Sequence, residues 1–148
     1  PVFYAGIGQY LTAGEIGCAM SHRQAACWVA AGDHDLALVL EDDLIPCRSE
    51  WKLECAEVAR ALLPYAHRRE AFVCLLGARP DHTDAALHRA VKWNGAAPNA
   101  PQLFEYVDPD RTLWRAHAYL ISRGAAERSR DREIQIATLA DDWGARLR

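Results

Sequence analysis

The sequence predicts a single α/β domain. Its 148 residues, 51% of them hydrophobic, suffice for one globular unit with a sizeable core. Two segments with helical periodicity alternate with two short apolar runs at residues 36–40 and 71–76, and such runs are typical of strands buried on both faces. A strand, helix, strand order usually closes as a right-handed parallel crossover. We therefore expect a mainly parallel sheet with flanking helices.

The first helix is marked by its start. Thr12 followed three residues later by Glu15 matches the capping box, in which the two residues exchange side-chain and backbone hydrogen bonds. The helix should run to about Ala31 and stop at Gly32. Apolar residues at helical spacing predict its buried stripe: Ile16, Ala19, Met20, Cys27 and Ala30 or Ala31.

A second amphipathic helix is predicted at about residues 50–66, between the two apolar runs. We expect it to pack on the sheet through a stripe of small and aliphatic residues: Leu53, Ala56, Ala59, Leu62 and Leu63.

The second half of the chain is less regular. Residues 78–102 lack periodicity and contain prolines and an Asn-Gly pair, which predicts a long loop that is functional or mobile. Two strands at about 103–107 and 114–121 flank the turn-forming Asp108-Pro109-Asp110, so a hairpin is expected. A further helix begins near Gly124.

Composition narrows the partners and the compartment. A net charge of -3 provides no broad basic field, which argues against a nucleic-acid partner. The five cysteines include no Cys-x-x-Cys pair, so we expect reduced thiols and a cytoplasmic location. No signal peptide and no apolar stretch near the ~20 residues of a membrane span are seen. Late arginines favour a solvated face over a phosphate or membrane contact: Arg111, Arg115, Arg123, Arg128, Arg130 and Arg132.

The main candidate site is the acidic run Glu41-Asp42-Asp43, which directly follows the first apolar run. Adjacent carboxylates repel one another unless a cation neutralises them. Ligands of open α/β sheets bind beyond the carboxyl ends of the strands, and Mn²⁺ and Mg²⁺ prefer oxygen ligands. In extended geometry Glu41 and Asp43 share a face. A metal site and a simple run of capping acids are about equally supported by composition.

A second candidate group lies near the end of the chain. Asp141 or Asp142 could act as a general base, and the indole of Trp143 offers an apolar face to a sugar ring. Helix-capping acids are an equal alternative. His22 and His117 are candidates for substrate, metal or phosphate contacts, although a lone histidine is more often structural.

Together these motifs resemble glycosyltransferase family 25, the lipooligosaccharide biosynthesis proteins. The resemblance rests on the 11–22 block LTAGEIGCAMSH, on Trp28, and on ALVLEDD at 37–43. Further matches are HAYLIS at 117–122, Gly124-Ala125, and ADDW at 140–143. It implies a GT-A (Rossmann-like) fold. Residues 1–148 would form a single domain that corresponds to the carboxyl-terminal part of the family's domain.

The resemblance also implies roles for individual residues. Glu41-Asp42-Asp43 stands at the family's DxD-like motif, with Glu in the first place, so Asp43 and Glu41 become the expected metal ligands. The remaining roles follow the motifs: donor binding by Glu41, Asp42, Ser21 and His22, catalysis by Asp141 and Asp142, and acceptor binding by Trp143, His117 and Tyr119.

The implied activity is metal-dependent, inverting transfer of a hexose from a UDP-sugar to a saccharide acceptor on a lipid-linked oligosaccharide. UDP-galactose is the expected donor and Mn²⁺ or Mg²⁺ the cofactor, in a bacterial protein that is cytoplasmic or peripheral at the inner membrane. The alternative is a truncated, non-catalytic relative that binds a saccharide or a partner protein.

Overall fold

The computed structural model describes residues 3–4, 9–46, 49–76, 88–91, 103–106 and 117–131. In chain order the elements are β1 (Phe3–Tyr4), β2 (Gln9–Tyr10), α1 (Ala13–Ala31), β3 (Leu36–Leu40), α2 (Trp51–His67), β4 (Val73–Leu75), β5 (His88–Val91), β6 (Leu103–Tyr106), β7 (Ala118–Ser122) and α3 (Arg123–Asp131).

The main sheet has the order β3-β7-β4, and both pairings are antiparallel. The predicted α/β class is confirmed, but a mainly parallel, Rossmann-like sheet is not what the described strands form. β3 and β4 do run in the same direction, since both are antiparallel to β7. The strand that separates them comes from much later in the chain, and local sequence cannot reveal such an insertion.

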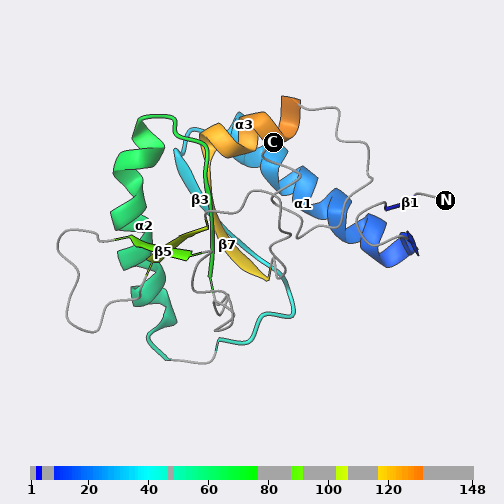
Figure 1. The fold of residues 1–148 in the computed structure, drawn as a ribbon, viewed down its shortest axis with the longest axis horizontal. Helices are drawn as coiled ribbons and strands as arrows, with labels where there is room; N and C mark the ends of the chain where they lie inside the picture. Colours follow the sequence, from blue (N-terminus) through cyan, green and yellow to red (C-terminus); the bar gives the residue numbers. More distant parts are fainter. Residues whose placement is uncertain are drawn as a thin grey trace.

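Helices cover both faces of this sheet. α1 and α3 lie side by side on one face, and α2 lies on the other (Figure 1). The alternation of side chains along β7 explains the three layers. Tyr119 and Ile121 point to the α1 and α3 side, whereas Leu120 lines a hollow beneath α2 together with Ala59 and Leu63.

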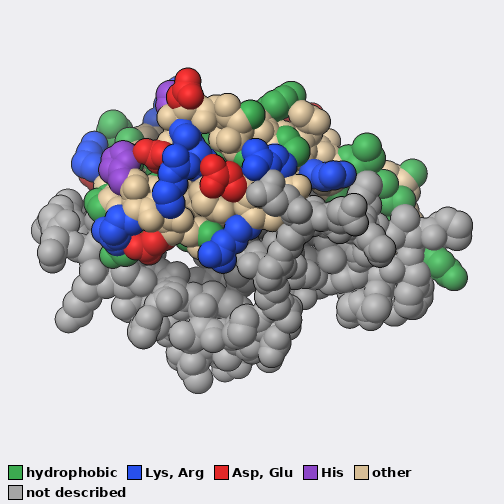
Figure 2. All heavy atoms as spheres, turned by 90° about the horizontal axis from the view of Figure 1, so that it is seen from above, with side chains coloured by type: hydrophobic (Ala, Val, Ile, Leu, Met, Phe, Trp, Pro, Cys, Tyr) green, Lys and Arg blue, Asp and Glu red, His purple; other side chains and the backbone are tan. Residues whose placement is uncertain are grey.

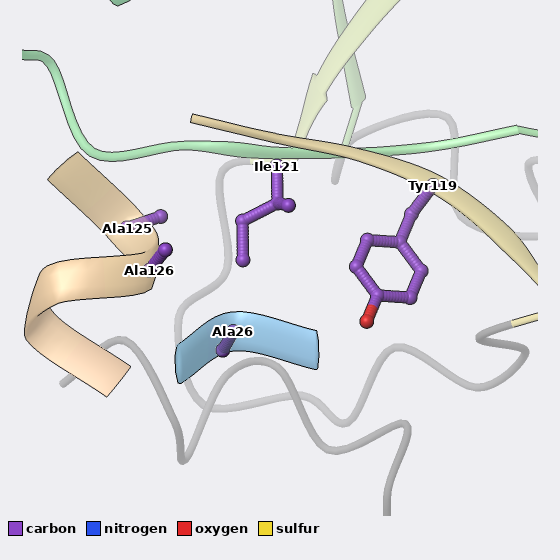
Figure 3. Packing of buried hydrophobic residues seen from close by; sticks show 5 residues of the cluster. All are labelled: Ala26, Tyr119, Ile121, Ala125 and Ala126. Carbon is purple, nitrogen blue, oxygen red and sulfur yellow. The ribbon is translucent and has the colours of Figure 1, made fainter. Parts of the chain in front are cut away.

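The core lies between the sheet and the α1–α3 layer. Tyr119 and Ile121 extend from β7 towards Ala26 of α1, with Ala125 and Ala126 of α3 beside them (Figure 3). Each of these five residues is at most 2% exposed. Alanines on both helices permit a close approach to the sheet, so the two bulky β7 side chains fill the layer.

The structure confirms the limits of α1. The Thr12 hydroxyl accepts from the backbone of Glu15, the Glu15 carboxylate accepts from the backbone of Thr12, and the helix ends at Gly32. The predicted stripe is wrong in part, since Met20 is exposed. Ala19 of the predicted stripe is buried, and His22 and Ala26, which the stripe did not include, are buried with it. Because His22 is polar, it interrupts the apolar pattern by which a buried helix face is recognised in a sequence.

α2 also lies where it was predicted, with a different buried face. Leu53 and Ala56 of the predicted stripe are exposed, whereas Val58 and Ala66 are buried. Leu53 in the first turn is 68% exposed, whereas Ala59, Leu62 and Leu63 of the predicted stripe are half-buried.

Strand burial and pairing differ from expectation. Leu38 and Leu40 of β3 are about 40% exposed, because β3 is the edge strand of this sheet and α2 covers its outer face incompletely. The expected hairpin is wrong as well. β6 pairs with β5, and β7 pairs with β3 and β4. β5 lies inside the stretch predicted as a loop, where a four-residue strand gave no periodic signal.

Charged side chains of both signs are interspersed over the described part of one face (Figure 2). Arg68 pairs with Glu70, and Arg69 pairs with Glu127. Of the late arginines, Arg128 and Arg130 are exposed and Arg123 is partly buried, whereas Arg111, Arg115 and Arg132 lie outside the described residues. Among the residues the structure describes, no helix combines the length and hydrophobicity needed to cross a bilayer.

Candidate functional site

The candidate site forms where β3 ends and β7 begins. Glu41 is the first residue after β3, and its backbone N–H donates to the carbonyl of His117, which directly precedes β7 (2.9 Å). This bond extends the β3–β7 ladder by one step and brings the two residues together. Asp42 and Asp43 then form a turn at the same edge. Antiparallel pairing has therefore joined the acidic run to a histidine that lies 76 residues further along the chain.

The carboxylate of Glu41 is held by two imidazoles. Its Oε1 lies 3.1 Å from Nε2 of His22, and its Oε2 lies 2.5 Å from Nδ1 of His117. Partial burial alone would raise the pKa of Glu41, but the hydrogen bonds with His22 and His117 outweigh it and lower that pKa below its usual value. Glu41 is therefore an ionised, oriented carboxylate at neutral pH.

His22 is the buried member of this arrangement. It lies on the inner face of α1 and is 4% exposed. Its Nδ1 lies 2.8 Å from the Tyr119 hydroxyl, and the two rings are 5.6 Å apart between centroids. Tyr119, in the centre of the sheet, is fully buried. A continuous hydrogen-bonded chain thus runs from Tyr119 through His22 and Glu41 to His117.

Glu41, Asp43 and His117 also form a group able to hold a cation. One ligand atom from each lies within 4.8 Å of the others, and Asp43 and His117 are exposed to solvent. Carboxylate oxygens suit Mg²⁺ and Mn²⁺, and an imidazole favours the transition metal. The donor set therefore fits a divalent cation that retains open positions for a substrate.

The other predicted residues are placed differently. Ser21 is exposed, and its hydroxyl donates to the carbonyl of Gly17 in its own helix (3.1 Å). Tyr119 is fully buried in the core, where its hydroxyl contacts His22, and its acceptor role stays a prediction. Asp42 is exposed. The predicted catalytic and acceptor residues Asp141, Asp142 and Trp143 lie outside the described residues.

One residue of the site was not predicted. Cys18 lies one turn before His22 on α1, and its Sγ is 3.8 Å from Glu41 Oε1. The spacing of four residues, which places both side chains on one helix face, was the available signal.

Comparison with protein families supports the motif evidence. Residues 3–67 match the model described as glycosyltransferase family 25 (LPS biosynthesis protein). The predicted family resemblance is confirmed. The match extends from β1 to the end of α2 and includes Cys18, His22 and the acidic run. Comparisons with curated proteins and with solved structures give no match.

Family 25 indicates the general class of activity, which is glycosyl transfer in lipopolysaccharide biosynthesis, with a sugar donor and an acceptor as substrates. His117 and β7 lie outside the matched span. The structure thus joins the family-matched α1–β3 segment to a partner strand that the family model does not cover.

Proposed function

We propose that this protein transfers a hexose, with galactose the expected sugar, from a UDP-sugar to a saccharide acceptor in lipooligosaccharide or lipopolysaccharide biosynthesis. The supporting observation is the convergence of Glu41, Asp43 and His117 at one sheet edge, where Glu41 and Asp43 belong to the segment that matches family 25. The reaction would invert the anomeric carbon and take place at the cytoplasmic face of the inner membrane.

The expected cofactor is Mn²⁺, or Mg²⁺ in its place. Asp43, Glu41 and His117 would hold it, and when bound it would stabilise the negative charge that develops on the departing UDP. Asp43 is the exposed carboxylate of the group, whereas Glu41 is already engaged by two histidines. We therefore assign Asp43 the larger share of metal affinity and Glu41 the task of keeping the group assembled.

The donor nucleotide would approach this edge from the solvent side. His117 is exposed there, with its Nδ1 directed at Glu41. An imidazole oriented in this way presents its other nitrogen to a ligand, so His117 could contact either a donor phosphate or the acceptor. Proton removal from the acceptor hydroxyl remains assigned to Asp141 or Asp142, on the motif evidence alone.

Binding of UDP measured by isothermal titration calorimetry, with and without Mn²⁺, tests this proposal. We expect Mn²⁺ to strengthen UDP binding and Asp43→Ala to abolish that metal dependence. Asp33→Ala, an exposed acid at the opposite end of β3, is the matched control and should behave like the wild type. Failure of UDP to bind even with metal would reject the enzyme function.

A sugar-transfer assay separates the enzyme from a non-catalytic binding module. Release of UDP from UDP-galactose in the presence of a truncated lipooligosaccharide acceptor is expected of the enzyme. Metal-dependent UDP binding without release of UDP from any UDP-hexose would favour the binding module.

A further inference from the structure

The Oε1 side of Glu41 carries a second group of potential ligands. Cys18, His22 and Glu41 each place one ligand atom within 4.8 Å of the others. The hard-cation group described above includes Asp43 and His117, and His117 contacts the opposite carboxylate oxygen, Oε2. Glu41 thus stands between two donor sets of different chemistry.

From this geometry we infer that Cys18, His22 and Glu41 form a binding site for a thiophilic divalent cation, Zn²⁺ in the first instance. The site shares Glu41 with the Mn²⁺ or Mg²⁺ group but takes its other ligands from α1, and it does not depend on the proposed transferase activity. Sulfur, imidazole nitrogen and carboxylate oxygen are the three ligand types of zinc, and three protein ligands leave a fourth position open.

The measured separations fit this assignment. Tetrahedral zinc, with bonds near 2.0–2.3 Å, holds its ligand atoms about 3.4–3.6 Å apart. The distance from Glu41 Oε1 to His22 Nε2 is 3.1 Å, and that from Glu41 Oε1 to Cys18 Sγ is 3.8 Å. Both separations lie within a few tenths of an ångström of the tetrahedral values, and the ligand atoms of Cys18 and His22 lie within 4.8 Å of each other.

The backbone holds the ligands in this arrangement before any metal arrives. Cys18 and His22 lie one turn apart on α1, and Glu41 is fixed by its backbone bond to His117. A cation here therefore requires little reorganisation of the chain. The Cys18 thiolate and the Glu41 carboxylate together supply two negative charges, which balance the charge of Zn²⁺.

Tyr119 contacts the His22 ring from the buried side of the site. A metal-bound histidine usually donates its second N–H to an oxygen, which fixes the tautomer. The Tyr119 hydroxyl lies 2.8 Å from His22 Nδ1 and can either donate or accept. Without metal, Nε2–H can donate to Glu41. With metal, Nδ1–H would donate to Tyr119 and leave the Nε2 lone pair for the cation, while the thiol proton of Cys18 passes to solvent.

Cobalt(II) titration of the full chain tests the site directly, because a thiolate ligand gives Co²⁺ a charge-transfer absorption that nitrogen and oxygen ligands alone do not. We expect this band in the wild type, its loss on addition of Zn²⁺, and its absence in Cys18→Ser. Cys27→Ser, a half-buried cysteine further along the same helix, is the matched control and should retain the band.

Zinc affinity gives a second measurement. Loss of an outer-shell partner typically weakens metal binding 10–100-fold, so loss of the Cys18 ligand should raise the zinc Kd by more than about tenfold. Unchanged cobalt spectra or zinc affinity in folded Cys18→Ser would overturn the inference.

An experiment on the unmodified protein guards against a variant that fails to fold. Zn²⁺ should slow alkylation of Cys18, identified by mass spectrometry, and a chelator should restore the rate. Cys27 should react at the same rate in both conditions. Equal protection of both cysteines, or of neither, would reject the site.

Discussion

Ser122 carries an unusual share of hydrogen bonding for one hydroxyl. It ends β7, is fully buried, and its Oγ accepts from two backbone N–H groups, that of Phe72 at 3.0 Å and that of Ala125 at 3.2 Å. The first bond ties the approach to β4 to the sheet, and the second caps α3. One hydroxyl thus links three elements.

We predict that Ser122→Ala lowers the free energy of unfolding by about 2–4 kcal/mol, because two buried N–H groups lose their acceptor. Urea unfolding followed by circular dichroism measures this loss.

Ser129→Ala provides the control for that variant. Ser129 is also fully buried, and its Oγ has no hydrogen-bond partner in the described part of the chain. Removal of an unpaired hydroxyl should leave stability unchanged or raise it. A loss at position 129 equal to that at 122 would show that serine volume, and not hydrogen bonding, determines the effect.

The candidate site shows how far residue chemistry can be predicted from sequence. Three adjacent acids indicated a cation, and the structure does place Asp43 and Glu41 together. From the sequence, His22 and His117 were two separate candidates, and nothing indicated that both contact Glu41. Their joint hold on Glu41 depends on contacts across 19 and 76 positions, and side-chain type alone cannot specify such contacts.

The close approach of α3 to the turn after α2 depends on a glycine. A Cβ at Gly124 would lie 2.6 Å from the Arg69 carbonyl oxygen and 3.2 Å from that of Glu70. Both contacts are with backbone, which cannot move aside as a flexible side chain could. The start of α3 is therefore fitted against this turn.

Gly124→Ala should lower the free energy of unfolding by about 1–3 kcal/mol, since α3 must shift to relieve the overlap. Thermal and urea unfolding measure the change.

Gly17→Ala is the matched substitution in α1, where a new Cβ would meet nothing within 4 Å. There alanine should stabilise the helix by about 0.5–1 kcal/mol, because glycine loses more backbone entropy on folding. If both variants lose stability equally, the close approach at Gly124 does not explain its effect.

At the scale of elements, local sequence signals were sufficient to locate α1 and β3, but the sequence carried no signal for which strands pair. The capping box and Gly32 defined both ends of α1, and the apolar run located β3. The edge position of β3 and the pairing of β6 with β5 could not be predicted from the sequence. Strand pairing depends on distant segments that compete for the same partner.

Three elements are joined at the end of the sheet opposite the candidate site. Asp35, just before β3, accepts from Nδ1 of His67 at the end of α2 (2.8 Å), and Arg123 at the start of α3 lies 3.9 Å from the same carboxylate. The hydrogen bond with His67 lowers the pKa of Asp35, and the charge of Arg123 adds to this effect.

This cluster predicts an acid-sensitive contribution to the stability of the whole molecule. A carboxylate whose pKa is lower in the folded state stabilises the fold above its unfolded pKa, near 3.9, and the contribution is lost as the pH falls through the folded value. We expect Asp35→Asn to reduce stability at about pH 6 and to approach the wild type below about pH 4.

Urea unfolding across that pH range measures the difference. Asp33→Asn controls for removal of one exposed negative charge nearby. A constant difference between Asp35→Asn and the wild type at every pH would mean that the ionised contact with His67 and Arg123 does not contribute.

The sequence by itself determined the local features of this protein: the α/β class, the limits of α1 and α2, the acidic run after β3, and the family 25 resemblance. These depend on nearest neighbours, caps and periodicity, which act within a few residues. Only the tertiary structure decided that β7 lies between β3 and β4 and so brings His117 to Glu41, while packing of α1 brings Cys18 and His22 to the same carboxylate. The position of β7 and the packing of α1 depend on long-range pairing and burial. Each strand or helix face can pair with several segments of the chain, and the pairing that forms depends on all of them together.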